Sequence, residues 1–561
     1  MKKIILLLIL LSSIMFAQVQ SSKYLVFFKD KQSSFLKSKA DQEKWVLSHL
    51  SRKAIERRKM RGKGALWDER DLPVPDHYIH QVTKCGARII HRLKWFNAVS
   101  VQIESEAVLK KVEALPFVKG IRPVKTFKFK KDFKLNSSGF FKTAVDTANL
   151  LNPVIQFVKA DSLKNAGYDG TGVIVGVFDT GFKLSQPVLS NIKNHLIAQY
   201  DFVENDSLVE GAEEGHGTLT SSVIGGVYLD SVQSYEGLAP GANFILCRTE
   251  YVRTETHVEE DNWAAAAQFA ESLGVDIIST SLGYSTFDAG EGDYTYQDMD
   301  GKTTIITRAA NMMTEKGVVV VVAAGNEGNY SWHYITAPAD GFDVISVGAI
   351  GLDSVMASFS SYGPTADGRV KPEIVAPGVN VPGAAARYLN SPLTTASGTS
   401  LACPVVAGGL ALILQAYPDI SLQDLRSAII ETANANLIKN ATEVPGDQYG
   451  YGVIQISKVY DALRMVDSIG EITDNYGDII LGPNPVSFST GYMLYSIKQG
   501  FKRPVVLSIY NILGQKLLEY KFSLSSGIIP LQALRKSGAG IYLFKLDVNG
   551  KQIVRRIIMM K

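Results

Sequence analysis

The sequence predicts an α/β protein whose central part is a parallel sheet, preceded by a small α+β unit and followed by a small all-β module. Between about residues 150 and 465, short β-branched runs alternate with Ala-rich helical stretches. A basic block with an amphipathic helix precedes this region, and short strands separated by turn residues follow it. A chain of 561 residues is long enough for about two to four domains. We therefore expect these changes of pattern to mark domain boundaries.

Composition excludes several classes of function. Hydrophobic residues are 46% and charged residues 20% of the chain, which is ordinary for a globular protein. The net charge of +3 predicts neither nucleic acid nor an acidic surface as a partner. The three cysteines, Cys85, Cys247 and Cys403, do not suit a disulfide framework and are expected to be mostly buried apolar residues. The sequence has no Cys-x-x-Cys or His/Cys cluster, so we expect no structural zinc.

Residues 1–17 have the pattern of a cleaved secretory signal. The stretch MKKIILLLILLSSIMFAQ has two lysines, an apolar run, and a small residue, Ala17, before Gln18. A membrane anchor is the alternative, but the apolar run is shorter than the roughly 20 residues that span a bilayer. No later segment is expected to span either. We therefore expect a protein that is secreted or attached to the cell surface.

Residues 20–135 form a basic block that predicts a small α+β unit. The stretch SRKAIERRKMRGKG (51–64) carries seven Lys/Arg and one Glu, and we interpret it as a solvated helix followed by a flexible loop rather than as a nucleic-acid patch. Residues 86–103 end in the alternation of a strand, and 105–124 predict an amphipathic helix that stops near Pro116 and then a short strand. Residues 125–139 predict an exposed linker.

Five apolar runs in the central region predict buried strands, and two stretches between them predict helices. Continuous apolar strands that alternate with helices indicate a parallel sheet covered on both faces. The expected strands are 173–178, 244–249, 275–282, 317–324 and 344–350, and the expected helices are 263–274 and 305–317. After about residue 470, the stretches 477–487, 505–522 and 540–561 predict short strands with Asn-Gly and Leu-Gly turns.

Two polar side chains stand at the ends of predicted central elements. Asp179 directly follows the strand 173–178, and functional residues collect at the carboxyl ends of strands in open parallel sheets. His216 lies between two glycines and opens an apolar helix, whose N-terminus should lower the pKa of the imidazole and keep it neutral. Taken alone, Asp179 could instead cap a turn, and His216 could be a capping or packed histidine.

Ser400 begins a second apolar helix, SLACPVVAGGLALILQAY, with small neighbours that leave its hydroxyl accessible. Pro404 fits the first turn of that helix. A serine hydroxyl becomes a nucleophile when a base takes its proton. His216 is the candidate base, and Asp179 would fix its tautomer and stabilise the imidazolium. Asn326 and the Ser400 N–H are candidate donors to an oxyanion, although Asn326 could also be a turn residue.

The order Asp, His, Asn, Ser, in the stretches DTG, GHGT, AAGNEG and SGTSLACPVVAG, resembles the subtilisin family of serine proteases over about residues 150–465. The stretch SSYGPTADGRVKPEIVAPG (360–378) is also similar to that family. The resemblance implies that Asp179 orients His216, which is general base and then general acid. It further implies that Ser400 attacks the substrate and that Asn326 lines the oxyanion hole.

A substrate-binding strand is also implied by this resemblance. The stretch STSLG (279–283) is similar to the edge strand on which an extended peptide pairs, a mode of main-chain recognition that accepts many sequences. The floor of the pocket for the residue before the cleaved bond is expected near Thr336 to Ala339. The flanks of that pocket would be Ser281, Leu282, Gly283, Ala323, Ala324 and Gly325.

Two stretches depart from the family pattern. Cys403-Pro404-Val405 stands where members usually have Pro-His, which bears on local packing. Residues 284–304 form an acidic, aromatic insertion that could be a lid, a cation site or a mobile loop. Members of the family often bind calcium, but no ligands can be assigned from this sequence. We therefore expect no metal and no cofactor.

The flanking regions fit the same resemblance. Residues 18–140 resemble a subtilase propeptide that chaperones and inhibits a peptidase domain at 145–465, with cleavage within 125–150. Residues 475–561 resemble a sorting domain of the type IX secretion route in GPNPVS, IYNILGQKL and the closing GIYLFKL and GKQIVRRIIMMK; a carbohydrate-binding β-sandwich is the alternative. We expect a monomeric zymogen exported across inner and outer membranes. Its partners would be protein or peptide substrates, its propeptide and the secretion machinery.

The leading hypothesis is therefore a secreted serine endopeptidase made as a zymogen. A catalytically inactive protein of the same fold that binds peptides or surfaces is the main alternative, and the presence of all four site residues counts against it. The stretch FDTG could be half of an aspartic protease site, but no second such loop stands in a matching setting. An α/β-hydrolase would need Gly-x-Ser-x-Gly and a different residue order.

Overall fold

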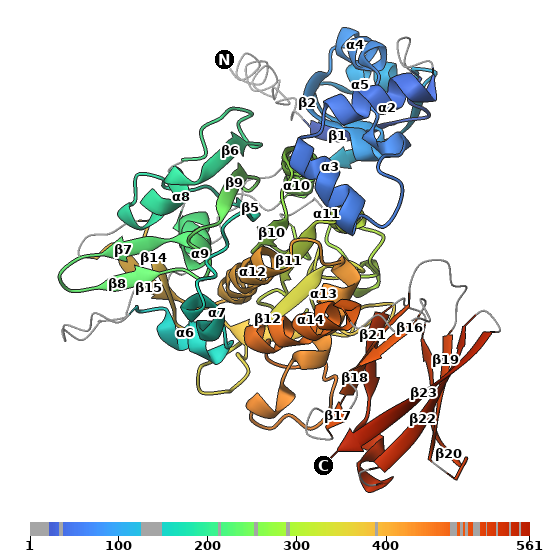
Figure 1. Ribbon diagram of the computed structural model, residues 1–561. Coiled ribbons are helices and arrows are strands. Elements are labelled where there is room, and N and C mark those ends of the chain that lie inside the picture. Colours follow the sequence, from blue (N-terminus) through green and yellow to red (C-terminus); the bar gives the residue numbers. More distant parts are fainter. Residues whose placement is uncertain are drawn as a thin grey trace, which may run out of the picture.

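The computed structural model contains an N-terminal domain (22–124), a central domain (149–471) and a C-terminal domain (479–560) (Figure 1). The expected signal segment 1–17 and the expected linker 125–139 lie outside the described residues. The described residues are 22–32, 38–124, 149–210, 215–251, 256–287, 292–386, 391–471, 479–482, 486–487, 492–497, 505–511, 513–522, 526–537, 540–548 and 551–560.

The central domain is built on a seven-stranded sheet in the order β13-β12-β11-β10-β5-β9-β6. Every neighbouring pair in this sheet is parallel. The five predicted apolar runs form five of its strands, with ends shifted by one or two residues, and the two strands at the edges of the sheet, β6 and β13, were not predicted. The strands are β5 (Ile174–Asp179), β6 (Leu196–Asp201), β9 (Asn243–Arg248), β10 (Ile277–Thr280), β11 (Val319–Ala323), β12 (Ile345–Ile350) and β13 (Ile374–Pro377).

Successive residues of these strands face two different apolar cores. In β5, Val175 and Val177 join the core that contains α9 (Gly215–Gly225) and α12 (Thr399–Ala416). Ile174 and Phe178 join the core that contains α10 (His257–Leu273) and α11 (Ile305–Glu315). Burial on both faces explains the continuous apolar runs, and the predicted fold class is confirmed. Five further helices lie around the sheet: α6 (Asn152–Phe157), α7 (Asp161–Asn165), α8 (Ser190–Asn194), α13 (Leu422–Thr432) and α14 (Ile456–Glu471). Two small two-stranded sheets lie there as well. One pairs β7 (Val227–Leu229) with β8 (Ser234–Glu236), and the other pairs β14 (Val381–Ala384) with β15 (Leu393–Ala396).

The N-terminal domain is a four-stranded antiparallel sheet in the order β2-β3-β1-β4. One face packs on α4 and α5, which gives a βαββαβ arrangement. Residues of the other face, among them Leu25 and Ala98, join the core of α10 and α11. The bounds are β1 (Ser22–Phe28), α4 (Asp76–Lys84), β2 (Arg88–Leu93), β3 (Ala98–Ile103), α5 (Glu106–Glu113) and β4 (Val118–Val124).

Two helices, α2 (Lys39–Ser48) and α3 (Arg52–Arg61), are inserted between β1 and α4. The prediction that 51–64 is a solvated helix with a flexible loop is half wrong. The helix forms, but Arg57, Arg58 and Arg61 are buried. The reason is that α3 lies against the central domain, whose acidic side chains pair with these arginines.

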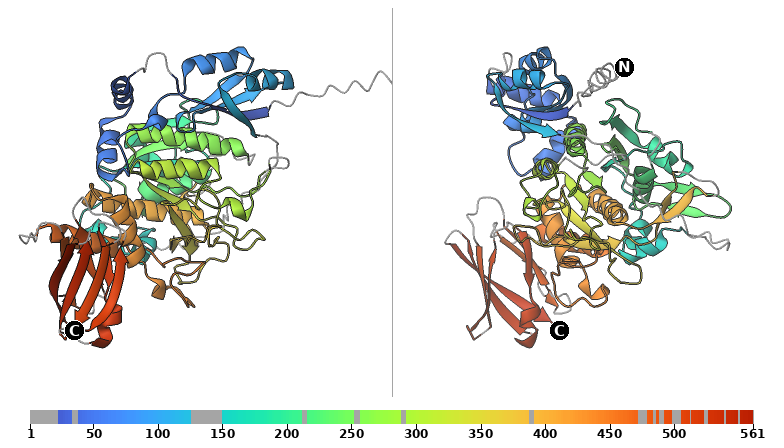
Figure 2. Two further views of the ribbon diagram at one scale, coloured as in Figure 1. Left: turned by 90° about the vertical axis from the view of Figure 1, so that its right-hand side faces the viewer. Right: turned by 180° about the vertical axis from the view of Figure 1, so that it is seen from behind.

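The C-terminal domain is a small β-sandwich with its own apolar core. Its sheets have the orders β16-β18-β21 and β17-β23-β22-β19-β20. It contacts α13 and α14, whereas the N-terminal domain contacts α10, so the two flanking domains occupy different parts of the central domain (Figure 2). The strands are β16 (Ile479–Gly482), β17 (Val486–Ser487), β18 (Tyr492–Ile497), β19 (Val505–Asn511), β20 (Lys516–Phe522), β21 (Ser526–Pro530), β22 (Gly540–Val548) and β23 (Lys551–Met560).

Helix α10 begins six residues earlier than predicted, because Thr256 and Glu259 form a capping box ahead of the alanine-rich stretch.

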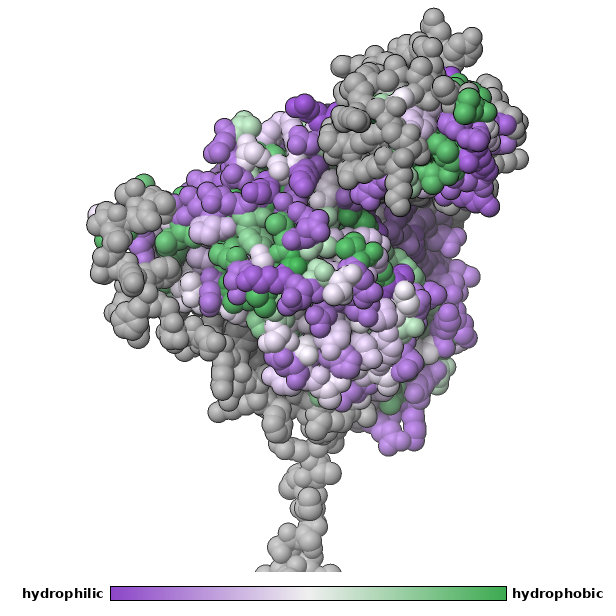
Figure 3. Space-filling view, turned by 90° about the horizontal axis from the view of Figure 1, so that it is seen from below, coloured by the Kyte–Doolittle hydropathy of each residue, from purple (hydrophilic) through white to green (hydrophobic). Residues whose placement is uncertain are grey.

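Helix α12 is, by length and composition, the one helix among the described residues that could cross a membrane, but 89% of its apolar window is buried inside the protein. The sequence analysis predicted this helix, but it did not recognise that the helix is long and apolar enough to span a membrane. Hydrophilic side chains predominate on the described surface seen in Figure 3, with apolar ones gathered near its middle.

Candidate active site

The candidate residues gather at the carboxyl edge of the central sheet. The chain runs from β5 to β6 and β9 on one side and then crosses to β10 on the other side of β5. Such a reversal of strand order leaves a crevice at the carboxyl ends of the two diverging strands. Asp179 is the last residue of β5, so it stands at this crevice.

Asp179 and His216 form a buried pair. The Nδ1 atom of His216 lies 2.7 Å from Oδ1 of Asp179, and the aspartate has no exposed surface. Thr220 donates its hydroxyl to Oδ2 at 2.9 Å, and the Thr180 N–H donates to Oδ1 at 2.7 Å. A Cβ on Gly217 would lie 3.0 Å from Cβ of Asp179, so the glycine allows α9 to approach β5 this closely.

The pKa of His216 is raised, not lowered as the sequence predicted. Burial lowers the pKa of the imidazole, but the charge of Asp179 and its hydrogen bond outweigh burial and hold that pKa above its usual value of 6.5. The helix N-terminus on which the prediction relied is therefore not the dominant influence. The imidazole of His216 gains a proton more readily than expected and is stabilised as a cation by Asp179.

Ser400 occupies the second position of α12, whose N-cap is Gly398. Its hydroxyl donates to the carbonyl of Ser281 at 3.3 Å, and the Ser281 hydroxyl donates to the carbonyl of Ser400 at 2.8 Å. Pro404 explains the second bond. It lies inside the helix, one turn later than predicted, and because proline has no N–H it cannot bond the carbonyl four residues before it. Ser281 satisfies that carbonyl instead.

The structure therefore brings the candidates together in two groups. Asp179 and His216 form one, on β5 and α9, and Ser400, Ser281 and Asn326 form the other, around the start of α12. Helices α9 and α12 pack against each other and join the groups (Figure 1). Among the described residues, the Ser400 hydroxyl donates to Ser281 rather than to His216.

Asn326 is held by the residue before Ser400. Its Oδ1 accepts from the Thr399 N–H at 2.9 Å and from the Thr399 hydroxyl at 3.0 Å. Because Oδ1 faces Thr399, the Nδ2 donors of this exposed side chain face the other way. The described hydrogen bonds use neither these donors nor the Ser400 N–H. Thr399 was not singled out in the sequence, because its role appears only when α12 meets the loop after β11.

Four of the six predicted pocket residues lie on two neighbouring stretches. Leu282 and Gly283 follow β10, and Ala324 and Gly325 lie beside Thr336. The described hydrogen bonds leave the backbone groups of Leu282 and Gly283 unused. A Cβ on Gly283 would lie 2.1 Å from the Thr336 hydroxyl, and one on Gly325 would lie 2.9 Å from it. Ala324 accepts the Thr336 N–H at 3.1 Å. The Thr336 hydroxyl itself is buried and has no hydrogen-bond partner among the described residues.

The other two predicted residues contribute differently. The side chain of Ser281 is turned inward to α12, and Ala323 belongs to the core between the sheet and α12.

Described residues of the 284–304 insertion pack against the domain: Tyr284 and Met299 are buried, and Tyr294 donates to Glu260 at 2.7 Å. A mobile loop was therefore the wrong interpretation for these residues.

The three cysteines are free thiols, and Cys247 and Cys403 are buried, as predicted. Cys403 lies beneath the site, with its Sγ 3.4 Å from the Val321 carbonyl. Burial raises the pKa of this thiol to about 12, so Cys403 packs as a small apolar residue.

Comparison with known proteins supports the resemblance found in the sequence. Residues 170–452 match the Subtilase family, and residues 23–138 match the Peptidase S8 propeptide domain of Bacteroidota.

Several curated relatives agree with these matches. The chain is 30% identical over 371 residues to the membrane-bound transcription factor site-1 protease of Rattus norvegicus, covering 64% of this chain but only 32% of that protein. It is 31% identical over 299 residues to subtilisin DY of Bacillus licheniformis, covering 53% of this chain and 93% of that protein. It is 27% identical to bacillopeptidase F of Bacillus subtilis, covering 82% of this chain and 32% of that protein. The chain thus spans about a third of the site-1 protease and most of the subtilisin, and it belongs to the subtilase family of serine proteases, with a propeptide domain ahead of its subtilase domain.

Proposed function

We propose that this protein is a serine endopeptidase, made as a zymogen, that hydrolyses peptide bonds with Asp179, His216 and Ser400. The observation that carries the proposal is the 2.7 Å contact between His216 Nδ1 and a fully buried Asp179. His216 lies on α9, which packs against α12, the helix that bears Ser400. A merely structural histidine would need no such charged partner at the carboxyl edge of the sheet.

In the proposed reaction, Ser400 Oγ attacks the carbonyl carbon of the substrate as its proton passes to His216 Nε2. The hydroxyl turns from the Ser281 carbonyl to the imidazole, a rotation about one side-chain bond, and catalytic hydrogen bonds often tighten only when substrate binds. Asp179 stabilises the imidazolium through Nδ1, and the imidazolium then gives its proton to the leaving amine. Water repeats the sequence to release the acyl group from Ser400. This chemistry needs no metal ion.

The negative oxygen of the tetrahedral intermediate would be bound by two donors. Asn326 Nδ2 is aimed away from Thr399 by the two bonds to Oδ1, and the Ser400 N–H is among the first N–H groups of α12, which have no partner within a helix. Fixed donors of this kind stabilise the transition state without having to reorganise.

The substrate would lie along Leu282 and Gly283, whose unused backbone groups suit pairing with an extended peptide. Its side chain before the cleaved bond would enter between Gly283 and Gly325 and meet Thr336. The Thr336 hydroxyl then offers a hydrogen bond at the pocket floor, which favours a substrate side chain that ends in a polar group over one that ends in a methyl group.

We also propose that the chain is exported. The segment 1–17 would direct passage across the inner membrane, and the C-terminal domain would act as a type IX sorting domain for passage across the outer membrane. Its separate sandwich core supports an independent role. The protein would act as a monomer, with protein or peptide substrates, its own propeptide and the secretion machinery as partners.

Replacing the nucleophile tests the proposed activity. In the matured enzyme, Ser400→Ala should abolish both peptide hydrolysis and covalent labelling by a fluorophosphonate probe, because it removes the hydroxyl that His216 is proposed to activate. Ser397→Ala is the matched control, since Ser397 is exposed and lies three residues earlier, just before α12, and it should keep both. If the parent enzyme is not labelled, the protein is instead the inactive peptide-binding member of the family.

A second substitution tests the oxyanion hole. Asn326→Ala should lower kcat by about 10²–10³ with little change in KM, because the lost donor binds only the transition state. Thr399→Val removes one of the two contacts to Asn326 Oδ1 but keeps the donors, so its loss should be below about tenfold. Steady-state kinetics on one peptide substrate would compare them, and an unchanged kcat for Asn326→Ala would remove this residue from the mechanism.

The pH profile tests the raised pKa of His216. Its imidazole is a base only when neutral, so kcat/KM should rise with pH through the His216 pKa, with a midpoint above 6.5. In Asp179→Asn the raising charge is gone and burial still lowers the pKa, so the midpoint should fall below that of the parent while the rate drops by about 10⁴. A midpoint that stays in place would separate Asp179 from the base.

Export is tested by deleting residues 475–561 in a host that has the type IX route. The truncated chain should accumulate inside the cell envelope, because the sorting signal is lost. Measured proteolytic activity in the envelope fraction would show that the rest of the chain has folded. Normal appearance of the truncated protein outside the cell would overturn the sorting role and favour the carbohydrate-binding alternative.

A further inference from the structure

Helix α3 of the N-terminal domain lies across the C-terminal ends of α10 and α11. The Ser51 N–H donates to the carbonyl of Ser272 at 2.8 Å, and the Lys63 N–H donates to the carbonyl of Glu315 at 2.8 Å. The glycines that follow the two helices make room for it. A Cβ on Gly274 would lie 2.9 Å from the Ala54 nitrogen, and one on Gly317 would lie 2.8 Å from Arg61 Cβ.

Arg57 caps both helices at once. Its guanidinium donates to the carbonyls of Lys316 at 3.1 Å, Val275 at 2.6 Å and Glu271 at 3.2 Å, and also to the Glu271 carboxylate. The carbonyls of Glu271 and Lys316 lie at the ends of α10 and α11, where the last carbonyl groups lack partners within the helix and carry partial negative charge. The carbonyl of Val275 follows the end of α10. Arg57 is 1% exposed, and all the hydrogen bonds of its guanidinium among the described residues go to the central domain.

Arg58 extends the contact into a network. It donates to both oxygens of Glu271, at 2.8 and 2.7 Å, and to Asp71 of its own domain at 2.9 Å. Lys316 of the central domain completes the network with Asp71 at 2.8 Å. Burial raises the pKa of Glu271, but the charges of Arg57 and Arg58 outweigh burial and hold it below the usual value, so the network is ionised.

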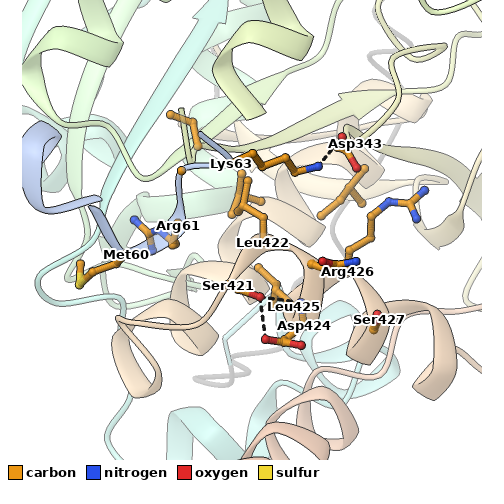
Figure 4. Close-up of a pocket in the computed structure, with 15 residues that line it drawn as sticks. Met60, Arg61, Lys63, Asp343, Ser421, Leu422, Asp424, Leu425, Arg426 and Ser427 are labelled. Atoms are coloured by element: carbon orange, nitrogen blue, oxygen red, sulfur yellow. Dashed lines mark hydrogen bonds and ion pairs between the residues drawn. The ribbon is translucent and has the colours of Figure 1, made fainter. Parts of the chain in front are cut away.

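Arg61 and Lys53 bind a second carboxylate, Asp276, which precedes β10. Beyond this point the interface opens into a cavity of about 630 Å³. Figure 4 shows Arg61 and Lys63 on one side of it and residues of α13 on the other, with Lys63 paired to Asp343. Ion pairs of Arg61 and Lys63 with the central domain thus lie beside this cavity.

These contacts lie at the amino edge of the sheet, opposite the candidate active site. Asp276 and the carbonyl of Val275 stand just before β10, and Lys316 just before β11, whereas Asp179 ends β5. Helix α3 therefore cannot act by covering Ser400. It can instead hold the N-terminal domain on the central domain. Each of its buried arginines forms an ion pair with a carboxylate of the central domain, and that carboxylate would lose its partner if the N-terminal domain dissociated.

We propose that helix α3 is an arginine anchor that keeps the N-terminal domain bound to the central domain after the linker between them is cut. The proposal rests on the zymogen function proposed above and adds a second determinant of release. Removing one member of a buried ion pair leaves the other charged and unsatisfied, which weakens a contact by a factor on the order of 100 or more. The lifetime of the cut complex would thus depend on Arg57, Arg58 and Glu271.

The test uses the full chain with Ser400→Ala, so that no self-cleavage occurs, and a recognition site for a specific protease inserted within 125–148. After the cut, dissociation of the N-terminal domain is followed by surface plasmon resonance. Arg57→Gln with Arg58→Gln should raise the release rate by about 100-fold or more. Arg52→Gln and Lys59→Gln are matched controls, because these cations are exposed on the same helix, and each should change the rate by less than about threefold.

A second variant distinguishes loss of the anchor from unfolding of the N-terminal domain. Glu271→Gln lies in the central domain and should also speed release, and combined with Arg58→Gln it should add much less than the product of the two single effects. Release of all variants at the parent rate would overturn the anchor. Because the readout is binding in a Ser400→Ala chain, the result stands whether or not Ser400 is the nucleophile.

Discussion

The fully buried carboxylate of Asp179 is the constraint on which the carboxyl edge of the sheet depends. An unsatisfied buried charge costs several kcal/mol, about 3–5 when a partner is removed, so its oxygens need donors. One donor is the next backbone N–H, and the other two, His216 and Thr220, come from the first turns of α9. Helix α9 must therefore begin beside the end of β5, which Gly217 permits, and α12 then packs on α9.

Much of this arrangement could be predicted from the sequence because strand ends are visible in it. An apolar run followed by Asp179 marks the carboxyl end of a strand, and a small-residue run after His216 marks a helix start. Parallel strands bring such ends to one edge, so Asp179, His216 and Ser400 could be chosen as candidates without coordinates. Asn326 was chosen in the same way, since it follows the apolar run of β11.

What the sequence could not predict are relations between residues far apart in the chain. The inward turn of Ser281 follows from the missing N–H of Pro404, more than a hundred positions later, and both residues look ordinary in their own stretches. The raised pKa of His216 depends on the distance to one carboxylate, which outweighs the helix N-terminus visible in the sequence. Helix α3 was misjudged for the same reason, because the acids that bury Arg57 and Arg58 lie in another domain.

The two edges of one sheet thus carry separate roles in the proposed zymogen. The strands that separate them are short: β10 has four residues and β5 has six, so the edges lie roughly 13–20 Å apart at about 3.3 Å per residue. Residues at the carboxyl edge must suit the substrate and the transition state, which restricts what can change there. At the amino edge, Glu271 and Asp276 form ion pairs with arginines of the N-terminal domain. The lifetime of the inhibited complex can therefore be altered through Glu271 or Asp276 without any change in the groups proposed to perform the hydrolysis.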